Sequence, residues 1–452
     1  MVAKYQAIIV GAGLSGSWVA KELCDQGIKT VMIDRGPDVV HLRDYPTASK
    51  HPWEMEHRGR ISAREREENP IATQCYNYYE GSKHFFTKDA EQPYVQEKPF
   101  SWIRGYQVGG KSLLWARQVQ RWSQHDLDGP AQDDFAIPWP ITYKDIEPWY
   151  DRVEEFIGVS GEYDGLATLP DGKFLRSIGM NVVEKHFQET VAQNYKDRHV
   201  IYGRCAHLTE VKEIHRKQGR GTCQHRVICE RGCPFGGYFS ANSSTIPWAK
   251  RTGNLTIQAY SIVSHIIYDD RQEQAIGVEI INRETRERSQ IYAEVIFMNA
   301  GTLNTNMVLM NSKSPRFPAG IGNDHQLLGK YLAFHNYRAR LVAETGAFKD
   351  RVIDGRSMTN AYMPRWKNIH SLKEDFKRGY AVAFYAYRTY IEETTGVGED
   401  LLKKMTKAKN FGLWQIDAMM MGETIPKFEN HVRLHPSLVD KYGIPQLVIN
   451  VD

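Results

Sequence analysis

The chain has 452 residues, of which 41% are hydrophobic and 25% charged, and its formal net charge is +4. This length allows two or three domains with sizeable cores, and the composition is ordinary for a soluble globular protein. The small net charge gives no reason to expect a nucleic acid partner. No apolar run reaches the roughly 18 residues of a membrane span. The chain enters a strand so soon that we expect no signal peptide, and the sequence alone predicts a cytoplasmic location.

The predicted elements begin with a strand–turn–helix–strand unit. Residues 5–10 read as a short buried strand, a helix follows and ends at Gly27, and a second strand covers 30–34. Polar, irregular sequence over about 37–100 predicts loops wrapped over this unit. Later elements are an amphipathic helix at 141–161, meander strands at 254–267 and 276–281, a strand, glycine turn and helix over 292–312, and recurring strands after 337. The last group predicts a separate domain that contains a sheet.

The turn of the first unit carries a glycine motif, GAGLSG at 11–16. Gly11 would permit the tight turn, Gly13 would let a pyrophosphate approach the backbone, and Gly16 would let helix pack on strand. The helix N-terminus would offer free N–H groups to the phosphates. Asp34 ends the next strand, where a carboxylate could bond ribose hydroxyls. We therefore predict a dinucleotide site; the loop does not distinguish NAD from FAD, although its N-terminal position favours FAD.

A second glycine-rich stretch, WIRGYQVGGKSLLW, contains an arginine followed by a Gly-Gly-x-Ser segment. Adjacent glycines let backbone pass close to a flat ring, and a serine can bond phosphate or ribityl oxygens. The stretch resembles the glucose–methanol–choline (GMC) oxidoreductase family, in which such a segment lies against the flavin. The matching positions here are Arg104, Gly109, Gly110 and Ser112. Trp115 and Arg117, just beyond, fit packing and surface positions better than chemistry.

The likeness continues in order along nearly the whole chain. NLTIQAYSIVSHIIYD resembles the family's meander, which implies that main chain at Val263 contacts the adenine end of the cofactor. VIFMNAGTLNTNMVL resembles the strand and turn that return to FAD, which implies that Asn299, Ala300 and Gly301 lie beside it. LLGKYLAFH, ending at His335, resembles the segment that closes the first FAD domain. The resemblance thus implies an FAD-dependent enzyme that oxidises a CH–OH group.

The family's catalytic pair, a histidine followed by an asparagine or histidine, lies near the C-terminal end of its members. The sequence here stops at PQLVINVD, which reads as a strand of the substrate domain, so the pair is expected beyond residue 452. His431 and His435 lie in an alternating stretch, HVRLH, and fit surface positions better. We therefore assign no catalytic residue, and either the chain is a fragment or the protein is not catalytically complete.

Three of the six cysteines crowd together. Cys223, Cys229 and Cys233 form C-x5-C-x3-C followed by proline, and a Cys-Pro ending is typical of iron–sulfur loops. The arrangement resembles the flavoprotein large subunits of fructose, glucose, gluconate and glucoside dehydrogenases. That resemblance implies a 3Fe-4S cluster held by these three cysteines. A zinc site that recruits Cys205 or a nearby histidine, and plain reduced thiols, stay open as alternatives.

Together these features predict an α/β (mixed α+β) flavoprotein with a Rossmann-like FAD-binding domain and a second, mainly antiparallel-sheet substrate domain. The FAD domain would be discontinuous within 1–335, and the substrate domain would cover 336–452 and be incomplete. The FAD core would come from 1–36, 100–125 and 240–335, with a cysteine-rich insertion near 205–237.

The predicted reaction is oxidation of a sugar or polyol CH–OH group, with hydride passing to flavin. Electrons would leave through the iron–sulfur cluster to a cytochrome c. The resemblance also implies a small subunit, whose own export signal could carry this chain to the periplasm. The alternatives are an oxygen-using GMC alcohol or sugar oxidase without iron, an NAD-dependent dehydrogenase, and a non-catalytic flavin-binding protein.

Overall fold

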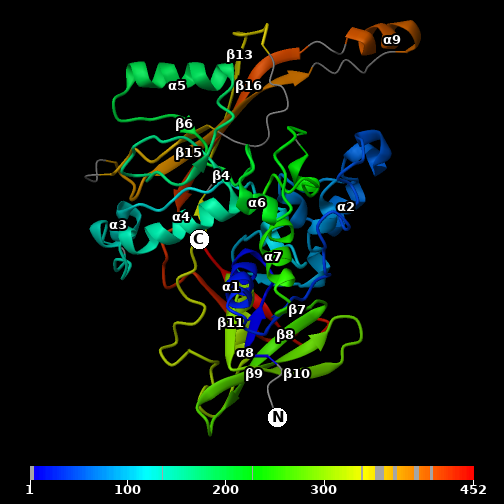
Figure 1. Ribbon diagram of the computed structural model, residues 1–452, viewed down its shortest axis with the longest axis vertical. Coiled ribbons are helices and arrows are strands. Elements are labelled where there is room, and N and C mark those ends of the chain that lie inside the picture. Colours follow the sequence, from blue (N-terminus) through cyan, green and yellow to red (C-terminus); the bar gives the residue numbers. More distant parts are fainter. Residues whose placement is uncertain are drawn as a thin grey trace.

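The computed structural model describes residues 5–134, 136–226, 228–336, 339–351, 361–369, 374–390, 397–407 and 411–452. The molecule is elongated, with a parallel sheet and a meander at one end and a larger antiparallel sheet at the other (Figure 1). The helices are α1 (Leu14–Asp25), α2 (Ala63–Glu68), α3 (Gln124–Gln132), α4 (Tyr143–Ile157), α5 (Val182–Asn194), α6 (Glu213–Lys217), α7 (Thr245–Arg251), α8 (Thr302–Asn311) and α9 (Gly398–Lys407). The strands are β1 (Ala7–Val10), β2 (Thr30–Ile33), β3 (Val95–Gln96), β4 (Val159–Ser160), β5 (Phe174–Leu175), β6 (Ile201–Tyr202), β7 (Leu255–Gln258), β8 (Ser261–Asp269), β9 (Gln274–Asn282), β10 (Arg288–Tyr292), β11 (Val295–Met298), β12 (His335–Asn336), β13 (Arg340–Thr345), β14 (Ala361–Met363), β15 (Tyr380–Tyr390), β16 (Phe411–Glu423), β17 (His431–Val439) and β18 (Pro445–Asn450).

The parallel sheet has the strand order β11-β1-β2-β7. Every residue of β1 and β2 is buried, as expected for strands that are covered on both faces. Because side chains alternate along a strand, Ile8 and Val10 face the meander formed by β8, β9 and β10, whereas Ile9 packs with residues of α1 and α7. This arrangement is the Rossmann-like unit expected from the sequence, and the predicted fold class is confirmed.

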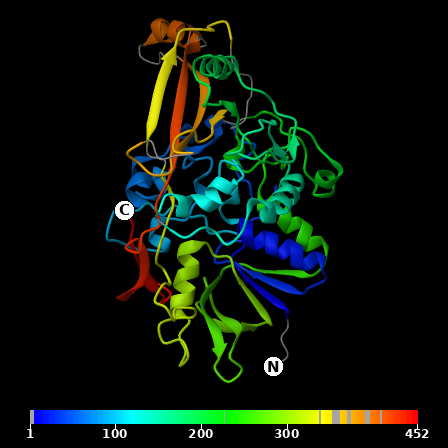
Figure 2. The ribbon, with the colours of Figure 1, turned by 90° about the vertical axis from the view of Figure 1, so that its left-hand side faces the viewer.

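The larger sheet is antiparallel, with the order β12-β16-β15-β14-β6 and with β13 paired to β16. Its long strands stand above the rest of the molecule, with α5 beside them (Figure 2). Asn181 caps α5 by accepting from the N–H groups of Val183 and Glu184. The Asn181 side chain also donates to the carbonyl of Ala386 at 2.9 Å. The cap therefore fixes α5 directly onto β15.

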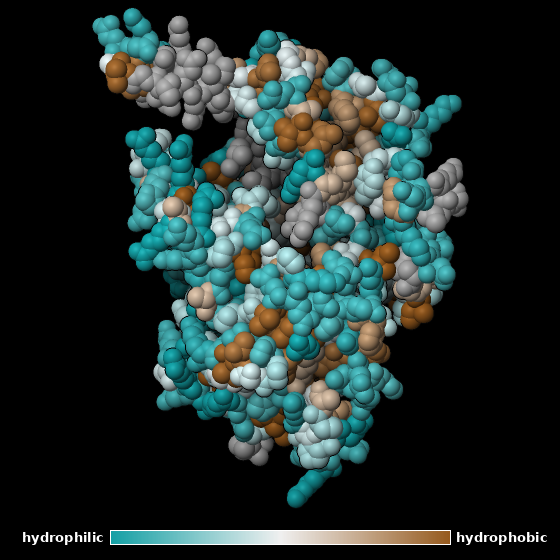
Figure 3. All heavy atoms as spheres, turned by 180° about the vertical axis from the view of Figure 1, so that it is seen from behind, coloured by the Kyte–Doolittle hydropathy of each residue, from teal (hydrophilic) through white to brown (hydrophobic). Residues whose placement is uncertain are grey.

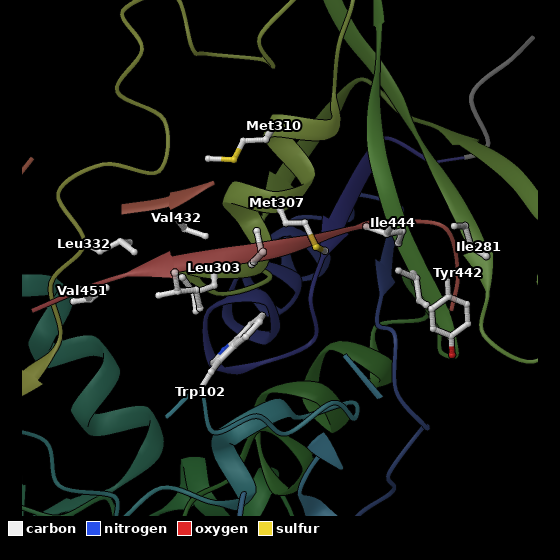
Figure 4. Close-up of a cluster of buried hydrophobic side chains, with 13 residues drawn as sticks. Trp102, Ile281, Leu303, Met307, Met310, Leu332, Val432, Tyr442, Ile444 and Val451 are labelled. Atoms are coloured by element: carbon white, nitrogen blue, oxygen red, sulfur yellow. The ribbon is translucent and has the colours of Figure 1, made fainter. Parts of the chain in front are cut away.

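The last two strands lie away from that sheet. β17 pairs with β18, and β18 pairs in parallel with β3, at residues 95–96. Figure 4 shows Trp102, Met307 and Val432 gathered around β18, in one buried cluster. Residues 431–450, which the sequence pattern placed in the substrate domain, thus pack beside α8, which the sequence assigned to the other domain. An apolar strand pattern indicates that a strand is buried, but it does not reveal which strand it pairs with. The domain boundaries themselves stay a prediction.

Within the ranges described above, no helix has both the length and the apolar character that crossing a membrane requires.

Candidate active site

The loop between β1 and α1 is closely packed at two of its three glycines. Gly11 has φ +102°, and a Cβ there would lie 2.5 Å from the carbonyl oxygen of Asn299. A Cβ on Gly16 would lie 1.9 Å from the carbonyl oxygen of Gly11. A Cβ on Gly13, which directly precedes α1, meets no atom within 4 Å. The approach to the helix N-terminus is therefore open at Gly13, as a bound pyrophosphate requires.

The carboxylate of Asp34 is bonded to the backbone around this loop. One oxygen accepts from the N–H of Ala12 at 3.0 Å, and the other accepts from the N–H of Gly36 at 2.9 Å. Burial raises the pKa of the Asp34 carboxyl, and these two backbone donors oppose the rise. Asp34 therefore fixes the shape of the turn. Its contact with a ribose stays a prediction.

The second glycine stretch lies directly against the first loop. The N–H of Gly109 donates to the carbonyl of Ala12 at 2.8 Å. A Cβ on Gly110 would lie 2.9 Å from the Cα of Gly13. Both Gly109 and Gly110 have positive φ, at +98° and +51°, a region that favours glycine. Two glycine segments almost a hundred residues apart in sequence thus form one backbone surface.

Ser112 and Asn242 hold the second stretch in place. The Oγ of Ser112 accepts from the N–H of Ala241 at 3.0 Å. Asn242 donates to the carbonyls of Val39 at 2.7 Å and Val108 at 2.8 Å, and its buried Oδ1 has no hydrogen-bond partner. Nothing in the sequence pointed to Asn242, because its partners lie more than 130 residues earlier in the chain.

The turn after β11 forms the wall of the first loop. The N–H of Asn299 donates to the carbonyl of Val10 at 2.8 Å, and its buried Oδ1 lacks a hydrogen-bond partner. Ala300 is half-buried beside it. Gly301, with φ +76°, precedes α8. The structure therefore brings residues 299–301 to the glycine loops. Their contact with the cofactor stays a prediction.

Two other residues that were expected to contact the cofactor, Arg104 and Val263, make contacts with other parts of the protein. Arg104 is 2% exposed, forms an ion pair with Asp89 at 3.5 Å and stacks over Trp102 at 4.9 Å. Its guanidinium also donates to the carbonyl of Gln92, so it anchors the second glycine stretch to a neighbouring loop. Val263 is a buried member of the core between meander and parallel sheet. Their contacts with the cofactor stay predictions.

Two residues near the second glycine stretch, Lys111 and Tyr76, were not singled out from the sequence. Lys111 is exposed to solvent, yet burial lowers its pKa and the nearby Arg104 lowers it further, while Cys75 opposes the shift. Tyr76 follows Cys75 and exposes 67% of its surface.

Arg117 lies between the glycine stretch and the cysteine loop. Its guanidinium donates to the carbonyls of Ser112 and Phe239, each at 3.0 Å, and also to that of Trp115. The same group lies 4.0 Å from the ring centre of Tyr238. Arg117 is 1% exposed, so its expected surface position is wrong. A cation is retained in the interior because hydrogen bonds to carbonyls replace those to water.

The cysteine loop buries part of its thiols. Cys229 packs with Cys205 and Tyr238, and Cys233 lies against them. Burial and the neighbouring Glu230 raise the pKa of the Cys229 thiol. None of the six cysteines forms a disulfide. Among the described residues, no group of three or more His, Cys, Asp or Glu side chains is arranged to hold a metal ion, so a cluster would require the thiols to move closer together.

Comparison with known proteins identifies the family. A family model described as GMC oxidoreductase matches residues 5–337. The chain belongs to the GMC oxidoreductase family. FAD is the cofactor of this family, and the chain is an FAD-dependent oxidoreductase that acts on alcohol groups. The residues present fit FAD: the approach at Gly13 is open, and Asn242 and Asn299 each leave a buried amide oxygen without a partner beside the glycine loops.

This GMC protein is similar to curated enzymes over nearly all of its length. It is 23% identical to 2-methyl-1,2-propanediol dehydrogenase of Mycolicibacterium austroafricanum, covering 98% of this chain and 76% of that protein. It is 20% identical to the fructose dehydrogenase large subunit of Gluconobacter japonicus, covering 98% and 79% respectively. Among solved structures, pyridoxine 4-oxidase from Mesorbium loti aligns with a TM-score of 0.54 at 15% identity, covering 99% of this chain and 76% of that one. The last likeness shows the shared fold.

Proposed function

We propose that this protein oxidises a CH–OH group of a sugar or polyol to a carbonyl group. The observation that carries the proposal is the contact between Gly13 and Gly110. It joins the first glycine loop (residues 11–16, the pyrophosphate loop) and the second glycine stretch (residues 102–115, the flavin loop) into one surface. The similarity to enzymes named for fructose and for a propanediol supports the substrate class. When bound, FAD accepts the hydride that leaves the substrate carbon. The alcohol proton leaves separately, to a base that we assign to no described residue.

We further propose that Cys223, Cys229 and Cys233 hold a 3Fe-4S cluster, as the C-x5-C-x3-C spacing suggests. Its support is that Cys229 and Cys233 pack together and that all three cysteines lie in the same loop. Such a cluster would supply a route for electrons to a cytochrome c. A small subunit that carries its own export signal would fit this arrangement and would take the protein to the periplasm.

The test is an anaerobic spectrum of the purified protein, with FAD, iron and sulfide assayed on the same sample. D-fructose, D-glucose, glycerol and 2-methyl-1,2-propanediol are then added in turn. We expect bound FAD that at least one of these compounds reduces, and about three irons per chain. Cys229→Ser should lose the iron, and Cys24→Ala, whose thiol lies in the parallel-sheet core, should keep it.

The outcomes separate the alternatives. Flavin that is reduced without any iron present would contradict the cluster, and peroxide formed in air would then indicate an oxidase. An oxidase is the second candidate because a relative is named 6'''-hydroxyparomomycin C oxidase, from Streptomyces lividus. Bound flavin that no alcohol reduces would contradict the proposed reaction.

A further inference from the structure

The larger sheet leaves one face of β15 uncovered by α5. The ring of Phe384 packs against Phe187 of α5, with 5.0 Å between centroids. Ala386 shares a buried cluster with Val183 of the same helix. Because side chains alternate along a strand, Tyr385 points to the opposite face. Seen from behind, the molecular surface is hollowed below this sheet (Figure 3).

Four polar side chains meet on that opposite face. The strand register sets Tyr385 opposite Asp417 and Tyr387 opposite Gln415. Both tyrosine hydroxyls donate to the same oxygen of Asp417, at 3.2 Å from Tyr385 and 3.0 Å from Tyr387. The amide of Gln415 donates to the other carboxylate oxygen at 3.0 Å. The two phenol rings are stacked, with 5.4 Å between centroids and 21° between planes.

The shared carboxylate fixes the direction in which both hydroxyl groups donate their hydrogen bonds. A phenol has one proton to donate and oxygen lone pairs that accept. With both protons directed at Asp417, the remaining lone pairs of Tyr385 and Tyr387 are available to hydroxyl donors from a ligand. Tyr385 is 42% exposed, so its ring face also offers an apolar surface. Two acceptors side by side with an aromatic face match a ligand that carries neighbouring hydroxyls on an apolar carbon frame.

The face lies close to the flavin loop. Burial raises the pKa of Tyr76 to about 12, and the nearby Cys75, Glu230 and Tyr385 add to that rise. Tyr76 therefore lies within electrostatic range of Tyr385. Cys75 in turn interacts electrostatically with Lys111, which belongs to the flavin loop. These electrostatic interactions run from the sheet face to the stretch that is expected to lie against the flavin.

We propose that Tyr385, Tyr387 and Asp417, together called the tyrosine platform, bind two neighbouring hydroxyl groups of the substrate and thereby select sugars and polyols over monohydric alcohols. This inference rests on the proposed function and gives its substrate class a set of binding residues. A monohydric alcohol has a single hydroxyl, which the reaction itself consumes, so it leaves both phenol oxygens without a donor. A polyol has further hydroxyl groups, which can donate to both phenol oxygens.

The test compares Tyr385→Phe, Tyr387→Phe and Asp417→Asn in the FAD-loaded protein with Tyr163→Phe, a control on an exposed tyrosine. Anaerobic flavin reduction gives the half-saturating concentration and the limiting rate for D-glucose, D-fructose, glycerol and propan-1-ol. We expect each tyrosine variant to raise half-saturation by the reactive polyols about five-fold, as for loss of one neutral hydrogen bond. Values for propan-1-ol, and all values of the control variant, should stay within about two-fold of the wild type.

Calorimetric binding of the same compounds separates this inference from the proposed function. If no compound reduces the flavin but D-glucose or D-fructose binds and the phenylalanine variants weaken that binding, the reaction is wrong and the platform stands. If the flavin is reduced and the variants leave polyol half-saturation unchanged, the platform is overturned and the reaction stands. Equal weakening for propan-1-ol and polyols would also overturn the platform, because a general disturbance of the substrate site would affect both kinds of compound. If no polyol binds or reduces the flavin, the platform is likewise overturned.

Discussion

Alanine substitutions at Gly13 and Gly16 should both weaken FAD binding, but only Gly16→Ala should destabilise the protein without FAD. In the protein alone, a Cβ on Gly13 meets nothing within 4 Å, whereas a Cβ on Gly16 would lie 1.9 Å from the carbonyl oxygen of Gly11. Real Cβ contacts essentially never fall below 3.0 Å. The Gly16→Ala variant must therefore move α1 or the loop by about 1 Å. Backbone oxygen, unlike a flexible side chain, cannot turn away.

The size of each effect follows from these contacts. Overpacking a close contact costs about 1–3 kcal/mol, and the overlap at Gly16 belongs at the upper end because backbone must shift. For Gly16→Ala we expect the free energy of unfolding of the apo-protein to fall by about 3 kcal/mol, and we expect FAD to bind poorly. For Gly13→Ala we expect unchanged apo-protein stability, since the new methyl group faces open space. It would occupy the approach of the pyrophosphate, so a similar overlap cost of about 3 kcal/mol would weaken FAD binding roughly 150-fold.

Thermal unfolding of the apo-protein and fluorescence titration with FAD measure the two quantities separately. Gly346→Ala is the matched control, because its Cβ would make its nearest contact at 3.5 Å. Equal destabilisation of the apo-protein by Gly13→Ala and Gly16→Ala would refute the reasoning. So would normal FAD affinity in Gly13→Ala.

Three further substitutions test other parts of the structure. Asp34→Asn should weaken FAD binding about ten-fold in a dialysis assay, because one charge-assisted hydrogen bond to the loop is lost; unchanged affinity would contradict a role in shaping the turn. Arg117→Lys keeps the charge but cannot reach three carbonyls, so urea unfolding should show a loss of about 2 kcal/mol or more. Burial raises the pKa of Asp164 from 3.8 to about 6, so the folded protein holds the proton of this carboxyl more tightly than the unfolded chain does. The stability that this proton contributes is present below pH 4 and is lost as pH rises through 6. Asp164→Asn should accordingly raise the melting temperature relative to wild type at pH 7.5 and not at pH 4, and an equal gain at both values would contradict that shift.

The sequence predicted the features that local pattern determines. The first strand, the glycine turn and the following helix were each found within a few residues of their place, since periodicity and glycine spacing are properties of one short segment. The long strands of the larger sheet were found for the same reason, and so were β8 and β9 of the meander. Residues 255–258, which were expected in the meander, instead form β7 of the parallel sheet, because strand periodicity does not reveal the partner strand. The shorter strands β3 and β6 were missed, because two residues in a row carry no alternation.

The glycines of the site could be predicted from the sequence, but the side chains that hold them in place could not. Gly11 and Gly110 are recognisable because backbone close to a ligand needs residues without a side chain. Arg117 resembled any other arginine in the sequence, and only the carbonyls of Phe239 and Ser112 reveal its buried position. Asp34 was expected at a ribose, whereas its bonds to Ala12 and Gly36 could be seen only once the loop was folded.

The parallel sheet also sets the order in which the protein can mature during synthesis. β1 ends at Val10, yet one of its two neighbours, β11, begins at Val295. Asn299, which walls the first glycine loop, follows directly after that strand. A nascent chain must therefore keep an apolar strand unpaired on one side while almost three hundred residues are made, a period in which it is open to aggregation. FAD can find its complete loop only after that wait, so the cofactor joins a chain that already extends past Asn299 and cannot guide its early folding.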